Sequence, residues 1–154
     1  MRVQLDGQRP LLVPPGEGEA VTDRPERTIR ILGELEELIV SWFRYEPGEH
    51  GPDPHVHHRH TDAFYVLEGE VELSLGPELR TLTARPGTFT AAPPDVVHTF
   101  RNASDATAIF LCELGPPEYA ITDAGGNELS DRREEAMAIR TMVRERWAAL
   151  QTGH

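Results

Sequence analysis

The feature that most constrains the fold is a series of short apolar or alternating segments, each closed by a turn signal that is usually a glycine or proline. They lie at 28–32, 38–46, 63–67, 71–75, 79–84, 87–92, 96–100 and 107–114. No long helical pattern interrupts the series, so a parallel sheet with crossover helices is disfavoured. The length of 154 residues fits a single domain spanning 1–154. The sequence therefore predicts an all-β sandwich or barrel with its core at about 28–114.

Segments of different character flank this core. Residues 9–13 are consistent with a short edge strand, and 14–26 with a polar loop rich in proline and glycine. Near the other end, Asp131 and Glu134 have capping-box spacing, and apolar residues then recur at three- and four-residue steps. These are Ala136, Ile139, Val143, Trp147 and Leu150. The pattern predicts an α-helix at about 131–150, packed on its own barrel or on a second copy.

Composition excludes several function classes. The 26 acidic residues outnumber 15 basic ones, and the net charge of −11 disfavours nucleic acid and anionic membrane surfaces as partners. All basic residues are arginine, so lysine-based Schiff-base chemistry is absent. The single cysteine, Cys112, excludes an internal disulfide and a cysteine-rich zinc site, and is expected to be a buried core thiol. No apolar run reaches the length of a signal peptide or membrane span, so a cytoplasmic location is expected.

Five of the seven histidines lie between residues 50 and 60. On an extended segment His55 and His57 point to one face, whereas His58 and His60 point to the other. Neutral imidazole binds Zn, Cu, Fe and Ni, and a carboxylate completes many such sites. Asp62 and His98, the latter in a separate predicted strand, are the further candidates. The alternatives are a surface loop that binds nothing and, for His98, an ordinary partly buried histidine.

Two segments resemble the two sequence motifs of the cupin family. Residues 51–76 contain two histidines separated by one residue, then an acid, then six residues and a glycine. Residues 86–102 contain the second motif, with glycine, proline, histidine and asparagine in order. The matching positions are His55, His57, Asp62 and Gly69 in the first motif, and Gly87, Pro93, His98 and Asn102 in the second. The overall pattern is most similar to small single-domain cupins related to quercetin dioxygenases.

This resemblance implies a double-sheet jelly roll, also called a double-stranded β-helix, with a metal inside the barrel. It implies one divalent transition metal ion (Fe, Mn, Ni, Zn or Cu) held by His55, His57 and His98, with Asp62 as the fourth ligand. The family acid is usually Glu, so the shorter Asp62 leaves its direct coordination open and makes His60 an alternative ligand. Asp95 stands where the family has glycine, which puts the local loop shape in question.

The strands that carry the ligands also supply a candidate pocket. Phe64 and Val66 lie two and four positions after Asp62, and Val96 and Phe100 lie two positions before and after His98. On a regular strand, residues at this spacing point to the same face. These four apolar side chains are expected to point inward, either as plain barrel core or as the lining of a pocket. Such a pocket suits an aromatic or hydrophobic small molecule.

Three functions follow from a metal with open coordination positions. The leading interpretation is a metal-dependent dioxygenase acting on a small, aromatic or other organic molecule. The second is isomerase or lyase chemistry, with the metal as Lewis acid and a protein base. The third is a non-catalytic cupin that binds or senses a small molecule. A homodimer is expected, because open sheet edges must be covered and both the 9–13 strand and the terminal helix can do so.

Overall fold

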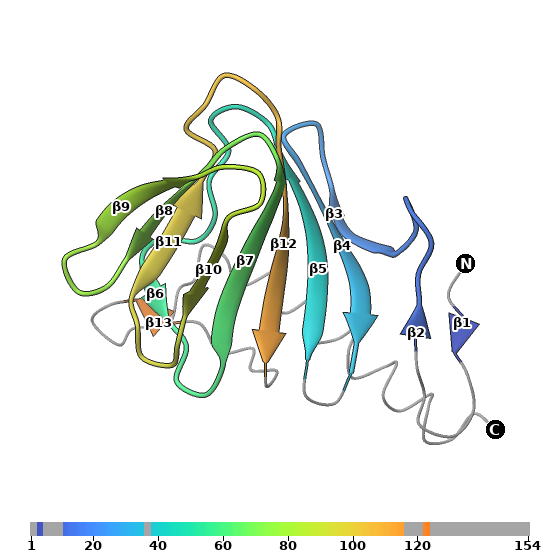
Figure 1. The fold of residues 1–154 in the computed structure, drawn as a ribbon, viewed down its shortest axis with the longest axis horizontal. Helices are drawn as coiled ribbons and strands as arrows, with labels where there is room; N and C mark the ends of the chain where they lie inside the picture. The colour runs from blue at the N-terminus through green and yellow to red at the C-terminus, as the bar shows by residue number, and fades with distance from the viewer. Residues whose placement is uncertain (1–2, 5–10, 36–37, 116–121, 124–154) are drawn as a thin grey trace.

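The computed structural model describes residues 3–4, 11–35, 38–115 and 122–123, and in them all regular structure is β-strand. Two antiparallel sheets face each other, and a separate two-stranded ribbon lies beside them (Figure 1). The predicted all-β jelly-roll class is therefore confirmed. The predicted helix at 131–150 lies outside the described residues. No helix within the described ranges is long and apolar enough to cross a membrane.

The first sheet has six strands in the spatial order β10-β7-β12-β5-β4-β3. They are β3 (Glu19–Asp23), β4 (Arg27–Glu34), β5 (Ile39–Tyr45), β7 (Thr61–Glu68), β10 (Phe89–Ala92) and β12 (Ala108–Gly115). The second sheet has five strands in the order β13-β6-β11-β8-β9. They are β6 (His55–Val56), β8 (Val71–Leu75), β9 (Arg80–Ala84), β11 (His98–Arg101) and β13 (Thr122–Asp123). The ribbon consists of β1 (Val3–Gln4) and β2 (Leu11–Leu12).

The core lies between the two sheets and is rich in aromatic rings. Phe64 on β7 and Phe100 on β11 meet across the interface with ring centroids 5.0 Å apart. Tyr45 and Phe110, on neighbouring strands of the first sheet, pack edge to face at 5.2 Å. Each of these side chains is buried. Contacts of this kind add to the hydrophobic stabilisation and leave one end of the barrel filled with side chains.

The strand β3 contradicts the loop that the sequence predicted. Residues 14–26 were expected to form a loop, but Glu19–Asp23 pair with β4 as an edge strand. The strand is half exposed, so it lacks the apolar alternation that would reveal it in the sequence. Its pairing comes from the backbone, since Arg24 and Arg27 exchange hydrogen bonds around the turn that joins β3 to β4.

The tight turn at Glu68–Gly69 joins two strands that lie in different sheets. β7 pairs with β10 and β12, whereas β8 pairs with β9 and β11. Gly69 has a φ of +70°, and a Cβ there would lie 2.2 Å from the carbonyl oxygen of Thr107. Both the backbone conformation and the close approach therefore require glycine.

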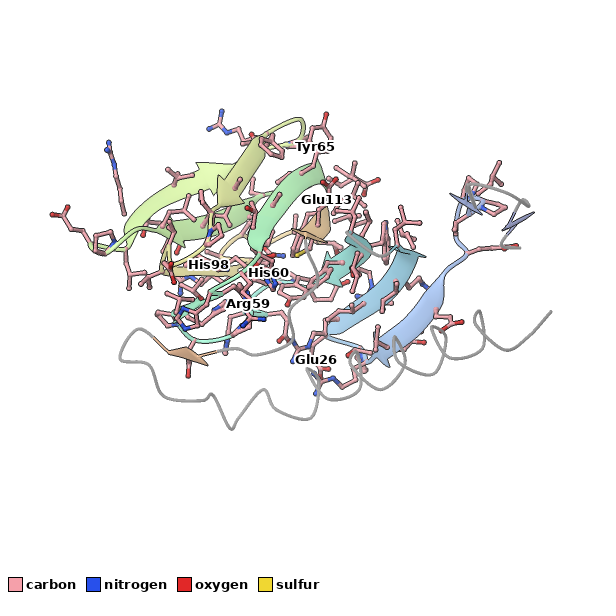
Figure 2. All side chains as sticks on the ribbon, turned by 90° about the horizontal axis from the view of Figure 1, so that it is seen from below. Glu26, Arg59, His60, Tyr65, His98 and Glu113 are labelled. Carbon is pink, nitrogen blue, oxygen red and sulfur yellow. The ribbon has the colours of Figure 1, made fainter. Side chains whose placement is uncertain are left out.

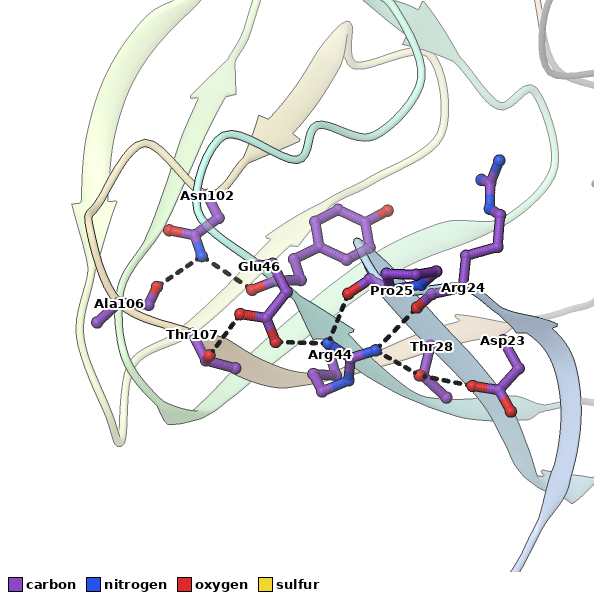
Figure 3. Close-up of polar contacts among 10 residues, drawn as sticks. Asp23, Arg24, Pro25, Thr28, Arg44, Glu46, Asn102, Ala106 and Thr107 are labelled. Carbon is purple, nitrogen blue, oxygen red and sulfur yellow. Dashed lines mark hydrogen bonds and ion pairs between the residues drawn. The ribbon is translucent and has the colours of Figure 1, made fainter.

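Polar contacts close the end of the barrel where β5 and β11 end (Figure 3). Arg44 donates to the carbonyls of Arg24 and Pro25 and pairs with Glu46. Asn102 donates to the carbonyls of Tyr45 and Ala106 at 2.9 and 2.8 Å. These contacts satisfy backbone groups that the strand ladders leave unpaired at this end.

Candidate metal centre

Four buried side chains from both sheets converge at one point between the sheets. His55 on β6 and His98 on β11 are paired across their strands in the second sheet. Asp62 begins the inward-facing positions of β7 in the first sheet, and His57 follows β6 directly. One ligand atom from each of the four lies within 4.8 Å of all the others. We call His55, His57, Asp62 and His98 the metal centre.

Asp62 reaches two of the three imidazoles directly. Its Oδ2 lies 2.8 Å from Nε2 of His98 and 3.4 Å from Nε2 of His57. The rings of His55 and His98 have centroids 4.2 Å apart, and those of His55 and His57 5.0 Å apart. The shorter side chain of aspartate therefore still brings its carboxylate into the group of imidazole nitrogens.

Backbone carbonyls orient two of the histidines. Nδ1 of His55 donates to the carbonyl of Asp53 at 2.8 Å, and Nδ1 of His98 donates to that of Val96 at 2.9 Å. With the proton on Nδ1, the neutral ring presents a lone pair on Nε2. Contacts of this kind fix the tautomer and ring direction of metal-binding histidines in general. The carbonyls of Asp53 and Val96 therefore fix the ring orientation of His55 and His98.

The donor set fits a transition metal ion. Nε2 of His98 and Oδ2 of Asp62 are both acceptors in this tautomer, yet they lie 2.8 Å apart. Two acceptors this close require a positive charge between them, either a proton or a cation. Three imidazole nitrogens with one carboxylate oxygen form a set that Zn, Cu, Fe and Ni accept. These residues could therefore hold one divalent ion of this kind.

The chain leaves regular strand geometry inside the histidine cluster, which changes where His60 points. β6 ends at Val56. His58 is exposed, as the alternation of side chains along a strand predicted, and its Nδ1 pairs with Oδ1 of Asp95 at 2.7 Å. Asp95 also donates its backbone N–H to the carbonyl of His57, with a φ of +67° that aspartate tolerates better than most residues.

His60 was expected on the outer face with His58, but it is fully buried. Its ring centroid lies 3.9 Å from that of His57, and Figure 2 shows His60 and His98 between the sheets. Within the described part of the chain, neither ring nitrogen of His60 has a hydrogen-bond partner. His60 is therefore a polar neighbour of the metal centre and not one of its four converging groups.

Burial favours the neutral form of two imidazoles, those of His55 and His60. Desolvation, with smaller effects from His98 and His57, lowers the pKa of His55 to about 3. Desolvation, followed by the effect of His57, lowers the pKa of His60 to about 4. For Asp62, burial alone would raise the pKa, but the contacts of its carboxylate with His57 and His98 outweigh it and hold the pKa well below its usual range. An ionised carboxylate beside neutral His55 is the protonation state that metal binding requires.

One contact of the metal centre was missed in the sequence. Cys112 on β12, expected to be a plain core thiol, is buried but also donates to Oδ1 of Asp62 at 3.1 Å. Burial and the charge of Asp62 raise its pKa well above the usual value, so the thiol keeps its proton. The register that places Cys112 opposite Phe64, one inward position from Asp62, could not be read without knowing that β12 pairs with β7.

The predicted pocket residues lie in two surroundings. Phe64, Val66 and Phe100 belong to the packed core, and the Phe64 ring lies 6.5 Å from that of His98. Val96 is partly exposed, between Asp95 and His98. A cavity of about 740 Å³ opens on the outer face of the second sheet, beside Glu72, Thr99 and Arg101, and of the four predicted residues Phe100 alone borders it.

Comparison with known proteins detects a cupin domain within the chain. Residues 41–113 match the model of the cupin domain family. Germin-like protein subfamily 2 member 2 of Arabidopsis thaliana is 29% identical over 158 residues, which cover 86% of this chain and 70% of that protein. The predicted cupin domain is therefore confirmed over residues 41–113. The closer resemblance to quercetin dioxygenases stays a prediction.

Solved structures agree on the fold. An RmlC-like cupin from Shewanella frigidimarina matches with a TM-score of 0.59 at 22% identity, covering 69% of this chain and 90% of that one. The polyketide cyclase RemF from Streptomyces resistomycificus matches with a TM-score of 0.58 at 24% identity, covering 80% and 87%. At these identities the likeness establishes the cupin fold and carries no activity to this chain.

Proposed function

We propose that this protein is a metal-dependent dioxygenase that acts on a small organic molecule, aromatic compounds among them. One divalent transition metal ion would be held by His55, His57, His98 and Asp62. The observation that carries the proposal is the convergence of four buried donor groups whose ligand atoms lie within 4.8 Å of one another. A set of four protein ligands leaves positions open on a six-coordinate ion.

The chain itself would contribute orientation and a dry environment. When bound, the ion supplies Lewis-acid and redox chemistry toward a chelating molecule and O₂. The carbonyls of Asp53 and Val96 hold two imidazoles in the tautomer that binds metal. The aromatic core, with Phe64 beside His98, excludes water on one side. Low local polarity strengthens the electrostatic effect of the ion on a bound molecule.

Oxygen consumption tests the proposal. Chelator-treated protein is loaded separately with Fe(II), Mn(II), Ni(II), Cu(II) or Zn(II), and O₂ uptake is followed with quercetin as a flavonol and acetylacetone as a diketone. We expect uptake with at least one redox-active ion, and none with a His98→Ala variant in the same buffer. Protein that holds its metal yet consumes no O₂ with any combination of metal ion and substrate would contradict dioxygenase activity and favour a binding or sensor role.

A second candidate, isomerase or lyase chemistry, is favoured by His60. This chemistry needs a protein group that exchanges a proton with the bound molecule. His60 is fully buried next to His57, and its nitrogens have no protein partner among the described residues. Anaerobic incubation with an α-hydroxyketone in D₂O, followed by NMR, would reveal deuterium incorporation. Incorporation that is equal in wild type and His60→Gln would contradict this role for His60.

We propose a homodimer in the cytoplasm, with a small molecule as its partner. The dimer is supported by the sheet edges that need cover. Light scattering decides the assembly: we expect about twice 17.2 kDa at micromolar concentration. A mass of one chain would refute the dimer, and cell fractionation tests the location.

A further inference from the structure

The carboxylate of Asp62 has different partners on its two oxygens. Oδ1 accepts a hydrogen bond from Sγ of Cys112 at 3.1 Å. Oδ2 lies 2.8 Å from Nε2 of His98 and 3.4 Å from Nε2 of His57. The thiol must be the donor, because an ionised carboxylate only accepts. One oxygen of Asp62 is therefore engaged by the protein, and the other faces the imidazoles.

Cys112 is held firmly enough to direct this carboxylate. It lies on the inner face of β12, opposite Phe64 on β7 and Ser41 on β5. Its side chain is 5% exposed and Asp62 is 3% exposed, so neither has water as a ready substitute partner. The last torsion of an aspartate is broad and roughly two-fold, which means that an unpartnered carboxylate can turn. A hydrogen bond to Oδ1 selects one orientation.

We propose that Cys112 is a positioning residue of the metal centre, whose thiol holds Oδ1 of Asp62 so that Asp62 offers Oδ2 alone to the ion. The inference rests on the proposed metal centre. Cys112 itself is not among the four converging groups, and its sulfur lies on the Oδ1 side of the carboxylate. The short side chain of Asp62 then acts as a single-oxygen ligand. Loss of a residue that orients a metal ligand typically lowers metal affinity by about 10–100-fold.

Three variants of the full chain separate positioning from packing. Cys112→Val removes the donor at similar volume, Cys112→Ser keeps a donor, and Phe110→Leu changes the next inward residue of the same strand without touching Asp62. Co(II) titration of each chelator-treated protein reports both affinity and the ligand-field absorption spectrum. We expect Cys112→Val to bind Co(II) about 10–100-fold more weakly with an altered spectrum. Cys112→Ser and Phe110→Leu should retain the wild-type spectrum.

Wild-type affinity and spectrum in Cys112→Val would overturn the inference, and so would equal losses in Cys112→Val and Cys112→Ser. Circular dichroism confirms folding, and Cys112→Ala takes the place of Cys112→Val if the valine variant fails to fold. If wild-type protein binds no Co(II), the proposed metal centre fails and this inference fails with it. If wild-type protein binds Co(II) and Cys112→Val binds it with the same affinity and spectrum, the positioning role alone is refuted.

Discussion

The buried histidines should make the metal-free protein lose stability as the pH falls below 6.5. His55 has an ordinary pKa of 6.5 when unfolded and about 3 when folded, chiefly because it is buried. Between these values the unfolded chain takes up a proton that the folded chain does not, so protons favour unfolding. Each pH unit in this window costs about 1.4 kcal/mol per such group. From pH 6.5 to about pH 5, His55 alone should lower the free energy of unfolding by about 2 kcal/mol.

Urea unfolding of chelator-treated protein between about pH 5 and pH 7.5 measures this effect. The window lies above the range where Asp62 titrates, because its unfolded pKa is 3.8 and its folded pKa is lower still. The matched variant is His55→Gln, which is uncharged at every pH. Its stability should fall with pH less steeply than that of wild type, by about 1.4 kcal/mol per unit well below pH 6.5. Parallel slopes in the two proteins would refute the claim that His55 is buried and neutral.

Four further substitutions at three positions test core packing and backbone conformation, each by urea unfolding. Gly69→Ala should lose about 2 kcal/mol or more, because its φ is +70° and the new Cβ would meet the carbonyl of Thr107; wild-type stability would contradict that close approach. Phe110→Ala should lose about 3–5 kcal/mol as a cavity opens in the aromatic core, whereas a loss below about 1 kcal/mol would show that the core is looser than described. Asp95→Gly should cost little and Asp95→Val about 1–2 kcal/mol more, since its φ is +67°; equal stabilities would argue against the left-handed conformation.

Local sequence signals were sufficient for the barrel strands because those strands alternate or carry apolar runs between turns. The segments at 38–46 and 107–114 correspond to β5 and β12, which lie at the centre of the first sheet. The edge strand β3 was not predicted, because a largely exposed edge strand needs no apolar face. The sequence also could not predict that the strands on either side of Glu68–Gly69 belong to different sheets. A tight turn can connect neighbouring strands of one sheet or strands of two different sheets.

At the candidate site, the spacing and the motif resemblance predicted His55, His57, Asp62 and His98 as metal ligands. The side chains of these four residues converge in the structure. The orientation of His60 could not be predicted from strand alternation, because β6 ends at Val56. The carbonyl of His57 accepts a hydrogen bond from the backbone N–H of Asp95 instead of continuing the strand. The contact of Cys112 with Asp62 joins residues 50 positions apart and depends on the strand register.

Metal content per chain tests the central claim most directly. Purified protein is stripped with chelator, incubated with one transition metal ion at a time, freed of excess by gel filtration and measured by elemental analysis, beside His98→Ala treated identically. We expect one ion per wild-type chain, and less than a tenth of that in the variant. Folded wild-type protein that retains no ion, or a His98→Ala variant that retains as much as wild type, would contradict the metal centre assigned to His55, His57, Asp62 and His98.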